Sequence, residues 1–432
     1  MKQLGIGLAG LGNVGAGVYK HLAQNRVLLR ERLGVEFVVK KVAVRDLAKV
    51  REVVVPAELL TNDPLSLITD PEVEVVVELM GGIETAFAFV MAAIAAGKIV
   101  VTGNKALLAE RGKEIFAAAE AKKVPIFYEA AVAGGIPIIK TVREAFVGNH
   151  ILSMHGIING TSNYILTRMS EAGLDFPEAL AEAQALGYAE ADPALDVNGW
   201  DAAHKAIILA SIAYGFWVDT TKIFVEGVEK VTAADIIFAR ELGYTIKLLG
   251  VIKAGIGERV EVRVHPTLIP KSHVLASVNG VFNAIAVRGD VVGDTLFYGR
   301  GAGQDPTTSS VISDLAEAAQ ALAAPRNFFG FTAHGIYGDL KPIEEVVTSF
   351  YLRLQVEDRP GVLGQVASIF GAHGIGISSV IQPEVPEGSE TIPLVLMIHL
   401  ATDGRMRKAL AEIEALDCVK APAALMRVET FS

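Results

Sequence analysis

The sequence predicts an α/β fold in three parts: an N-terminal doubly wound parallel sheet, a central α+β region and a small C-terminal domain of βαββαβ order. Three observations support this fold. At 432 residues the chain is too long for a single hydrophobic core. A glycine-rich motif follows the first apolar run, and strands and helices alternate at the C-terminal end in a different order from the first part.

Residues 1–130 are expected to form the first domain, because apolar strand-like runs alternate there with helical stretches, as in parallel βαβ units. We place its strands at Leu4–Ala9, Phe37–Val44, Val73–Leu79, Ile99–Thr102 and Pro125–Tyr128. This order predicts a Rossmann domain, which binds a dinucleotide at the carboxyl ends of its strands.

The hexapeptide GLGNVG after the first strand has the G-x-G-x-x-G pattern of a dinucleotide site. Gly10 and Gly12 let the chain turn tightly and let a pyrophosphate approach the backbone, and Gly15 permits close helix packing. Asn13 and Val14 open the helix, whose N–H groups attract phosphate. The strand before the motif and the helix after it make this prediction specific.

The second strand ends in VAVRD, and this ending fits two cofactors. Arg45 is placed to bind the 2′-phosphate of NADP, which is the cofactor we favour. If Asp46 binds the ribose hydroxyls and Arg45 points into solvent, the cofactor is NAD.

Thr102 and Lys105 follow the fourth strand at the sheet edge where ligands bind, so we expect both beside the nicotinamide. The alternative is that Asn104 caps the next helix and Lys105 is solvated. A second glycine loop contains Gly301 and Gly303 and precedes an expected helix. This loop either closes over the cofactor or makes a tight turn.

Residues 131–323 are expected to form a second, α+β domain, with 301–323 as a candidate for return to the cofactor domain. Helical patterns dominate as far as Gly243. Strand-like runs then follow at 245–255, 258–266, 282–290 and 294–300.

A charged stretch broken by glycine and proline leads to Lys205. It carries four acids, at Glu190, Asp192, Asp196 and Asp201. If a helix begins at Trp200, Asp201 and Lys205 stand one turn apart on one face, where an acid beside an amine can shuttle a proton. The alternative is a surface i,i+4 salt bridge that contributes about 0.3–0.5 kcal/mol. The apolar run 206–218 favours burial of the pair.

Residues 324–348 are expected to be a linker and 349–432 a separate small domain. Its order of strand, helix, strand, strand, helix and strand predicts a ferredoxin-like sandwich. The six segments are 350–358, 361–374, 377–384, 392–401, 404–417 and 423–429.

Composition excludes several partners. The net charge of −10, without a block of Lys or Arg, argues against nucleic acid and anionic membranes. The longest apolar windows, from Thr85 and from Ala206, are shorter than the roughly 18 residues of a membrane span. Cys418 is the one cysteine and cannot form an internal disulfide, and Met1 leads into an apolar run without a signal-like leader. We therefore expect a cytoplasmic protein.

With these residues in place, the chain closely resembles the homoserine dehydrogenase family, in the form that carries a C-terminal ACT domain. The resemblance covers essentially the entire length. Its most specific part is the charged stretch, where the family's spacing is matched at Ala183, Gly187, Tyr188, Ala189, Asp192, Pro193, Asp196, Val197, Gly199, Asp201 and Lys205.

The resemblance implies NAD(P)-dependent interconversion of L-homoserine and L-aspartate 4-semialdehyde, in threonine and methionine biosynthesis. It implies that Lys205 donates and accepts the proton, with Asp201 as its partner and Lys105 as a second catalytic lysine. His204 is a weaker candidate, because on a helix it would point about 100° away from Lys205.

Substrate binding in the family maps onto the same stretch. Glu190 would bind the substrate's ammonium group, and Asp196 and Tyr188 would complete the pocket. The family also places a monovalent cation, usually Na+, in a carbonyl-lined loop. That site maps onto Glu129, Val132, Gly134 and Ile136.

The C-terminal domain resembles amino-acid sensor modules, and the family's expected effector is L-threonine. The implied rim residues are Asp358, Gly361, Leu363, Gly374 and Ile375. A domain kept only for dimer contacts is an equal alternative. We expect a homodimer or homotetramer that associates through the central domain and the ACT modules.

Two other classes of function differ in the residues that they require. A non-catalytic, nucleotide-responsive amino-acid sensor would not require Lys105, Asp201 and Lys205 together. An aldehyde dehydrogenase acting through a thioester needs a cysteine beside the nicotinamide, and Cys418 lies in the C-terminal domain.

Overall fold

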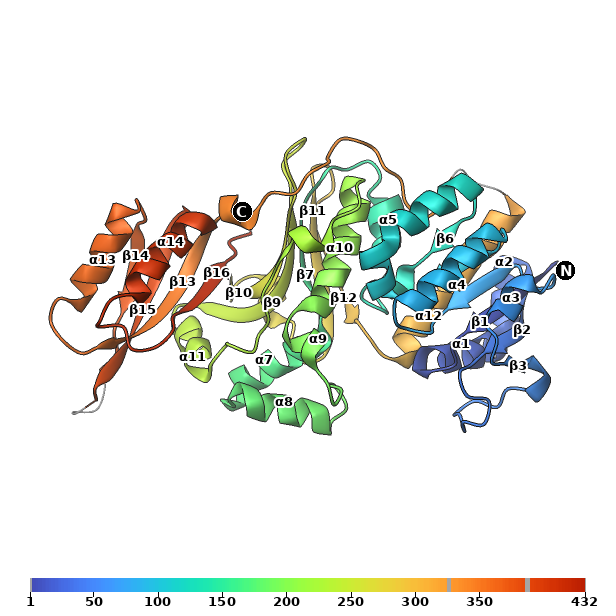
Figure 1. Cartoon of the computed structure of the whole chain (residues 1–432), viewed down its shortest axis with the longest axis horizontal. Helices are drawn as coiled ribbons and strands as arrows, with labels where there is room; N and C mark the ends of the chain where they lie inside the picture. Colours follow the sequence, from blue (N-terminus) through green and yellow to red (C-terminus); the bar gives the residue numbers. More distant parts are fainter. Residues whose placement is uncertain (1, 325–327, 385–388, 432) are drawn as a thin grey trace.

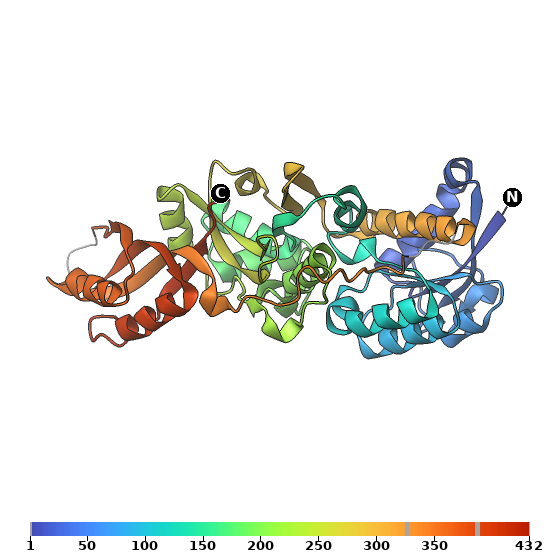
Figure 2. The ribbon, with the colours of Figure 1, turned by 90° about the horizontal axis from the view of Figure 1, so that it is seen from above.

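The computed structural model describes residues 2–324, 328–384 and 389–431. The N-terminal sheet, the central region and the C-terminal domain follow one another along the long axis of the molecule (Figure 1). The view from above shows the same sequence of parts (Figure 2). Residues 325–327 of the expected linker lie outside the described residues.

The N-terminal domain is built on a parallel sheet of six strands in the order β3-β2-β1-β4-β5-β6. This is the order of a Rossmann fold, as the sequence predicts. The strands are β1 (Lys2–Ala9), β2 (Val35–Ala43), β3 (Leu60–Thr61), β4 (Val75–Glu78), β5 (Ile99–Thr102) and β6 (Ile126–Phe127). The two-residue strand β3 is too short to give a pattern in sequence, and was not predicted.

Helices cover both faces of this sheet (Figure 1). They are α1 (Asn13–Gln24), α2 (Arg26–Leu33), α3 (Leu65–Thr69), α4 (Glu84–Ala95), α5 (Lys105–Lys122) and, from much later in the chain, α12 (Gln304–Ala323). Val311 and Leu315 of α12 are buried in the core of the cofactor domain. A Cβ at Gly17 of α1 would lie 2.3 Å from the Thr308 hydroxyl, so the two helices pack in close contact. Residues 304–323 therefore return to the first domain.

The central region contributes strands to a second, ten-stranded sheet. The six strands from the central region are β7 (Ile151–Ile157), β8 (Phe224–Val225), β9 (Tyr244–Lys253), β10 (Glu261–Pro270), β11 (Phe282–Gly289) and β12 (Gly293–Arg300). The four strand-like runs predicted from sequence correspond to β9 to β12. The expectation that helices dominate before Gly243 missed β7, because Ser153 and His155 interrupt its apolar run.

Helices cover the central sheet on one side (Figure 1). The helices of the central region are α6 (Ile138–Lys140), α7 (Gly160–Ala172), α8 (Phe176–Ala185), α9 (Ala194–Val197), α10 (Trp200–Tyr214) and α11 (Ala233–Glu241). Nearly every side chain of α10 is buried. Within the described residues, no helix has the length and apolar character needed to cross a membrane.

Short helical turns connect these elements. Five are 3-10 turns: η1 (Ala57–Leu59), η2 (Glu129–Ala131), η4 (Thr220–Lys222), η5 (Val274–Ser277) and η6 (Ile343–Glu345). A π-helical turn, η3 (Thr141–Ala145), follows α6.

The C-terminal domain has the predicted βαββαβ order. Its elements are β13 (Val347–Glu357), α13 (Val362–Ala372), β14 (Ile377–Ile381), β15 (Thr391–Thr402), α14 (Asp403–Glu414) and β16 (Ala424–Val428). The last strand, β16, pairs in parallel with β10 of the central region, through Thr267 with Arg427 and Leu268 with Val428. The two regions therefore share one continuous sheet, which the sequence did not predict.

Candidate active site

The glycine loop at the start of α1 has the shape of a phosphate cradle. Gly10 has φ +103, and a Cβ there would lie 2.4 Å from the Leu79 carbonyl oxygen. A Cβ at Gly15 would lie 2.1 Å from the Gly10 carbonyl oxygen, whereas one at Gly12 would meet no described heavy atom within 4 Å. Gly12 is also the N-cap of α1, so open space lies beside the first N–H groups of the helix. These features fit the pyrophosphate of a dinucleotide.

The second glycine loop brings α12 to the same place. Gly303 is the N-cap of α12 with φ +117, and the Gln304 amide donates to the Asn13 carbonyl oxygen at 3.0 Å. A Cβ at Gly301 would lie 1.8 Å from the Asn283 amide nitrogen, so this position requires glycine. The start of α12 therefore borders the cradle.

Arg45 and Asp46 lie just beyond the end of β2 and are both exposed. The Asp46 carboxylate accepts the Ala48 backbone N–H at 2.8 Å. The Asp46 carbonyl also accepts a bond from Arg51. Asp46 is thus already used to shape the turn.

Thr102 lies at the end of β5, and its buried hydroxyl is held within the protein. It donates to Glu78 at 2.7 Å and accepts the Asn104 backbone N–H at 3.1 Å. Burial raises the pKa of Glu78, a residue that the sequence analysis did not identify. Asn104 caps α5 by accepting the Leu107 N–H, as the alternative interpretation expected.

The two predicted lysines meet at one carboxylate. Lys205 Nζ lies 2.7 Å from Asp201 Oδ2, and Lys105 Nζ lies 3.2 Å from Asp201 Oδ1. Lys205 also donates to the Ile158 carbonyl at 2.7 Å. Lys205 is buried, whereas the Lys105 side chain is 40% exposed. Together with Asn159, described next, these residues form a candidate site that we call the catalytic cluster: Lys105, Asn159, Asp201 and Lys205.

Asn159 is the member of the cluster that the sequence analysis missed. Its side-chain amide donates to Asp196 and to Asp201, each at 2.7 Å. An Asn-Gly pair after an apolar run and before a helix is an N-cap pattern, which could have drawn attention to it.

The pKa values of the two acids in contact with Asn159 are shifted in opposite directions. Burial would raise the pKa of Asp201, but the charges of Lys205 and Lys105 outweigh it and hold the pKa well below its usual range. The pKa of Asp196 is raised, chiefly by burial and further by the charge of Asp201. Asp201 is therefore a stable anion between two amines.

The other predicted substrate residues lie on the loop before α9. Glu190 is exposed. The Tyr188 ring packs on Tyr164 with centroids 4.9 Å apart, and the Tyr188 carbonyl accepts the Thr161 hydroxyl. Tyr188 therefore borders the N-terminal end of α7, as Asn159 and Asp196 do.

His204 lies next to Lys205 in sequence but contacts a different element. Its Nε2 lies 3.8 Å from Glu110 Oε1 on α5, and burial lowers its pKa. Its only ion-pair partner in the described part of the chain is therefore outside the catalytic cluster.

The loop proposed for a cation follows β6. Ala133 and Gly134 both have positive φ, 53 and 28, a conformation rare for alanine. The Glu129 carboxylate accepts the backbone N–H groups of Ile139 and Lys140. The Gly134 carbonyl accepts the Ser310 hydroxyl, and the Ile136 carbonyl accepts the Ile138 N–H. Burial raises the pKa of Glu129 to about 7.

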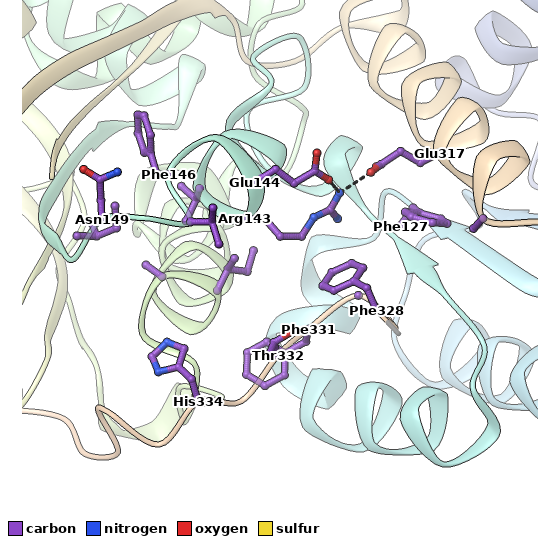
Figure 3. A pocket seen from close by; sticks show the side chains of 17 residues that line it. Phe127, Arg143, Glu144, Phe146, Asn149, Glu317, Phe328, Phe331, Thr332 and His334 are labelled. Carbon is purple, nitrogen blue, oxygen red and sulfur yellow. Dashed lines mark hydrogen bonds and ion pairs between the residues drawn. The ribbon is translucent and has the colours of Figure 1, made fainter. Parts of the chain in front are cut away.

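A cavity of about 630 Å³ lies between the cofactor domain and the central region (Figure 3). Figure 3 shows Arg143 in it, bonded to Glu317 of α12. Ile212 and Ala213 also line it, and they lie about 10 Å along α10 from Lys205. This cavity is therefore distinct from the catalytic cluster.

A smaller cavity, of about 330 Å³, lies in the C-terminal domain. Asp358, Gly361 and Leu363 line it, together with residues of the neighbouring strands. Gly374 and Ile375 lie elsewhere in the domain, and Ile375 is buried in its core.

The fold and these contacts define a class. A Rossmann phosphate-binding loop together with a cluster of lysines and a carboxylate is typical of a nicotinamide-dependent oxidoreductase. Three family models match the chain: homoserine dehydrogenase, NAD binding domain, over residues 10–129; homoserine dehydrogenase over 137–316; and ACT domain over 350–418.

Individual relatives agree. The homoserine dehydrogenase of Pseudomonas aeruginosa is 46% identical and that of Neisseria gonorrhoeae 44%, each with 100% of both chains covered. The crystal structure of a homoserine dehydrogenase from Thiobacillus denitrificans is 44% identical, with a TM-score of 0.92 over 99% of both chains. A hyperthermophilic archaeal homoserine dehydrogenase in complex with NADPH is 26% identical, has a TM-score of 0.63, and covers 75% of this chain and 99% of its own.

The chain therefore belongs to the homoserine dehydrogenase family, with a C-terminal ACT domain, and is an oxidoreductase. This family membership excludes the two alternative functions, a non-catalytic sensor and an aldehyde dehydrogenase that acts through a thioester. A non-catalytic sensor does not fit this family, and Cys418 is buried in the C-terminal core, away from the cradle.

Proposed function

We propose that this enzyme interconverts L-homoserine and L-aspartate 4-semialdehyde with NADP or NAD, on the route to threonine and methionine. One observation carries the proposal. The Asp201 carboxylate joins an almost buried Lys205 to a half-exposed Lys105, and Lys105 begins the helix that follows β5. This edge of a Rossmann sheet is where the reactive end of a dinucleotide binds.

The glycine cradle would hold the dinucleotide, and its reduced nicotinamide would supply a hydride to the aldehyde carbon, while the protein's own groups act on the oxygen. As the oxygen becomes alkoxide-like, the Lys205 ammonium donates a proton to it, and Lys105 stabilises its negative charge. Asp201 holds both amines in place and keeps its own charge. In the reverse direction Lys205 accepts the hydroxyl proton of homoserine.

Substrate recognition is proposed for the loop before α9. The Glu190 carboxylate binds the substrate's ammonium group, and its exposure leaves it free to turn toward a ligand. Asp196 and Tyr188 border the same space and complete the pocket. Supporting this, Asn159 ties Asp196 directly to the catalytic cluster.

NADP is the proposed preferred cofactor. Arg45 is exposed at the end of β2, while Asp46 already accepts a backbone N–H of the turn. A guanidinium in that position suits a 2′-phosphate. Arg45→Ala should therefore weaken NADP more than NAD, measured as the ratio of kcat/KM values; an unchanged ratio would assign Arg45 no part in the preference.

A monovalent cation, Na+ by family resemblance, is proposed for the loop 129–136. Left-handed backbone at Ala133 is costly and persists where something fixes it, which supports a functional loop. A carbonyl oxygen has two lone pairs, so those of Glu129, Val132, Gly134 and Ile136 can bind a cation beside their protein donors.

Regulation by L-threonine through the ACT domain is also proposed. The cavity lined by Asp358, Gly361 and Leu363 supports it, because it offers a carboxylate and a glycine turn to an amino acid. Gly374 and Ile375 are not part of this proposal, because they do not line the cavity.

Point variants of the full chain test the effector better than truncation, because β16 belongs to the central sheet as well. Asp358→Ala should abolish inhibition by threonine and preserve basal turnover. Glu412→Ala, which removes an exposed acid of the same domain bonded to His373, is the matched control. Equal inhibition of both variants would place the effector elsewhere.

Self-association is proposed through the central sheet. β12 lies at one edge of the ten-stranded sheet. Its residues Leu296 and Tyr298 are 39% and 56% exposed. Exposed apolar side chains on an edge strand favour pairing with a second copy.

The reaction itself is tested by incubating purified enzyme with L-homoserine and each oxidised nicotinamide. We expect reduced nicotinamide to accumulate, faster with NADP. No reduction with either cofactor would contradict the proposed activity.

A further inference from the structure

Asn159 stands where two acids and a helix meet. It lies two residues after the end of β7 and is the N-cap of α7, with extended backbone at φ −122 and ψ 111. Asn159 is 4% exposed, so its side-chain polar atoms need hydrogen-bond partners within the protein.

The orientation of the Asn159 amide is fixed from both sides. On one side the Ser162 backbone N–H can only donate, and it lies 2.7 Å from Asn159 Oδ1. On the other side Asp196 and Asp201 present carboxylate oxygens, which accept when ionised. The Nδ2 group carries two hydrogens, and it donates one hydrogen bond to each carboxylate, with N–O distances of 2.7 Å. Reversing the amide would break all three bonds.

The same strand end also holds the lysine. Ile158, the residue before Asn159, accepts a hydrogen bond from Lys205 Nζ at 2.7 Å. Asp201 Oδ2 receives both Asn159 Nδ2 and Lys205 Nζ. Two consecutive residues therefore fix the acid and the amine of the catalytic pair relative to each other.

We propose that Asn159 is a positioning residue for the reaction: it holds the Asp201 carboxylate between Lys105 and Lys205, and ties it to Asp196 of α9. The inference rests on the proposed function, because it concerns the same cluster. Asn159 does not touch the reacting atoms. It keeps two like-charged carboxylates in contact with one neutral donor group, so that the Asp201 anion stays aimed at the amines.

Two variants separate this role from helix capping. Asn159→Asp preserves the size of the side chain and an oxygen that can cap α7, and aspartate is as good an N-cap as asparagine. It replaces the two donated bonds by a third carboxylate. Asn159→Ser preserves a capping oxygen and removes the donors without adding charge.

Asn163 offers a matched control on the same helix. It is also buried, and its amide donates to the carbonyls of Val278, Gly280 and Phe282, outside the catalytic cluster. Asn163→Ser therefore loses a comparable set of buried bonds with no contact to the reacting groups. Thermal melting reports the structural cost of each variant, and steady-state kinetics report kcat and KM.

The positioning role predicts a kcat lower by roughly 10- to 100-fold in Asn159→Ser, the size expected for losing hydrogen bonds to charged groups. Asn159→Asp should lose more than Asn159→Ser, with KM for the cofactor unchanged in both. Asn163→Ser should keep the wild-type kcat while melting earlier.

A capping role alone predicts the opposite order, with Asn159→Asp equal to wild type. A folded Asn159→Asp enzyme with wild-type kcat would therefore overturn the inference and leave the proposed function intact. A wild-type enzyme that does not oxidise homoserine would instead overturn the proposed function, and the inference with it.

Discussion

Two clusters of buried charge in this chain each gather cations around a carboxylate, and they differ in the kind of cation that they bury. The catalytic cluster places two amines on one carboxylate, and one of them, Lys105, is half exposed. The second cluster lies where the C-terminal domain joins the central sheet; we call it the junction cluster, and it consists of Arg263, Glu429, Arg427 and Asp403.

The carboxylates of the junction cluster are shared as well: Glu429 also pairs with Lys253, and Asp403 also pairs with Arg407. Arg263 lies 2.6 Å from Glu429, with side chains 2% and 3% exposed. Arg427 pairs with Asp403, whose side chains are 1% and 0% exposed. These pairs lie where β16 meets β10, and the two arginines that they bury stay protonated in proteins. The comparison teaches that a buried lysine able to exchange its proton, rather than burial of charge or a shared carboxylate, distinguishes the proposed reactive site from a structural one.

The largest expected effect is on the catalytic side of this comparison. Lys205→Ala removes the proposed proton donor and should lower kcat by roughly 100- to 10,000-fold, the range for loss of general acid–base catalysis. Nucleotide binding, measured by fluorescence titration, should be unchanged, because the substitution does not alter the glycine cradle at residues 10–15.

The matched control is another buried lysine. Lys247 is 1% exposed and donates to the Val278 carbonyl at 2.6 Å, outside the catalytic cluster. Lys247→Met should lower stability and spare turnover per folded molecule. Equal loss of turnover in both variants would mean that burying any lysine matters, and would remove the special role of Lys205.

The junction cluster should show the reverse behaviour. Glu429→Gln leaves Arg263 buried without its carboxylate and should lower the free energy of unfolding by about 3–5 kcal/mol. Turnover per folded molecule should remain at the wild-type level. Urea unfolding and steady-state kinetics measure the two quantities; a fall in kcat without a loss of stability would make the junction part of the catalytic machinery.

A smaller, pH-dependent effect sharpens the same contrast. Burial would raise the pKa of Glu429, but Arg263, His155 and Lys253 hold it well below its usual 4.5. A carboxylate with a lowered folded-state pKa stabilises the protein above its unfolded pKa, and this stabilisation is lost as the pH falls. The stability difference between wild type and Glu429→Gln should therefore be constant near neutrality and shrink below about pH 4.5. A difference that grows in acid would contradict the proposed charge state.

Local patterns in the sequence predicted five of the six strands of the cofactor domain, all but β3. The glycine motif, the strands beside it and the helix starting at Trp200 follow from short-range spacing, and the structure places Asp201 and Lys205 on one helix face. The sheet that joins β10 to β16 was not predictable in this way. It depends on pairing between Thr267 and Arg427, residues far apart whose alternation gives no register.

The catalytic cluster was predicted in part for the same reason. Lys205 and Asp201 share a helix, so their spacing revealed them. Asn159 comes from the end of β7, a strand whose pattern Ser153 and His155 obscure. With β7 missing, no argument from sequence could bring Asn159 to the carboxylates.

The central claim is that Lys105 and Lys205 act as one unit through the carboxylate they share. A double-mutant cycle with Lys105→Ala, Lys205→Ala and the double variant tests it most directly, with kcat/KM for homoserine as the readout. We predict that the double variant loses much less than the product of the two single losses, because either substitution already disrupts the shared arrangement. Losses that simply multiply would show two independent lysines and would contradict the account.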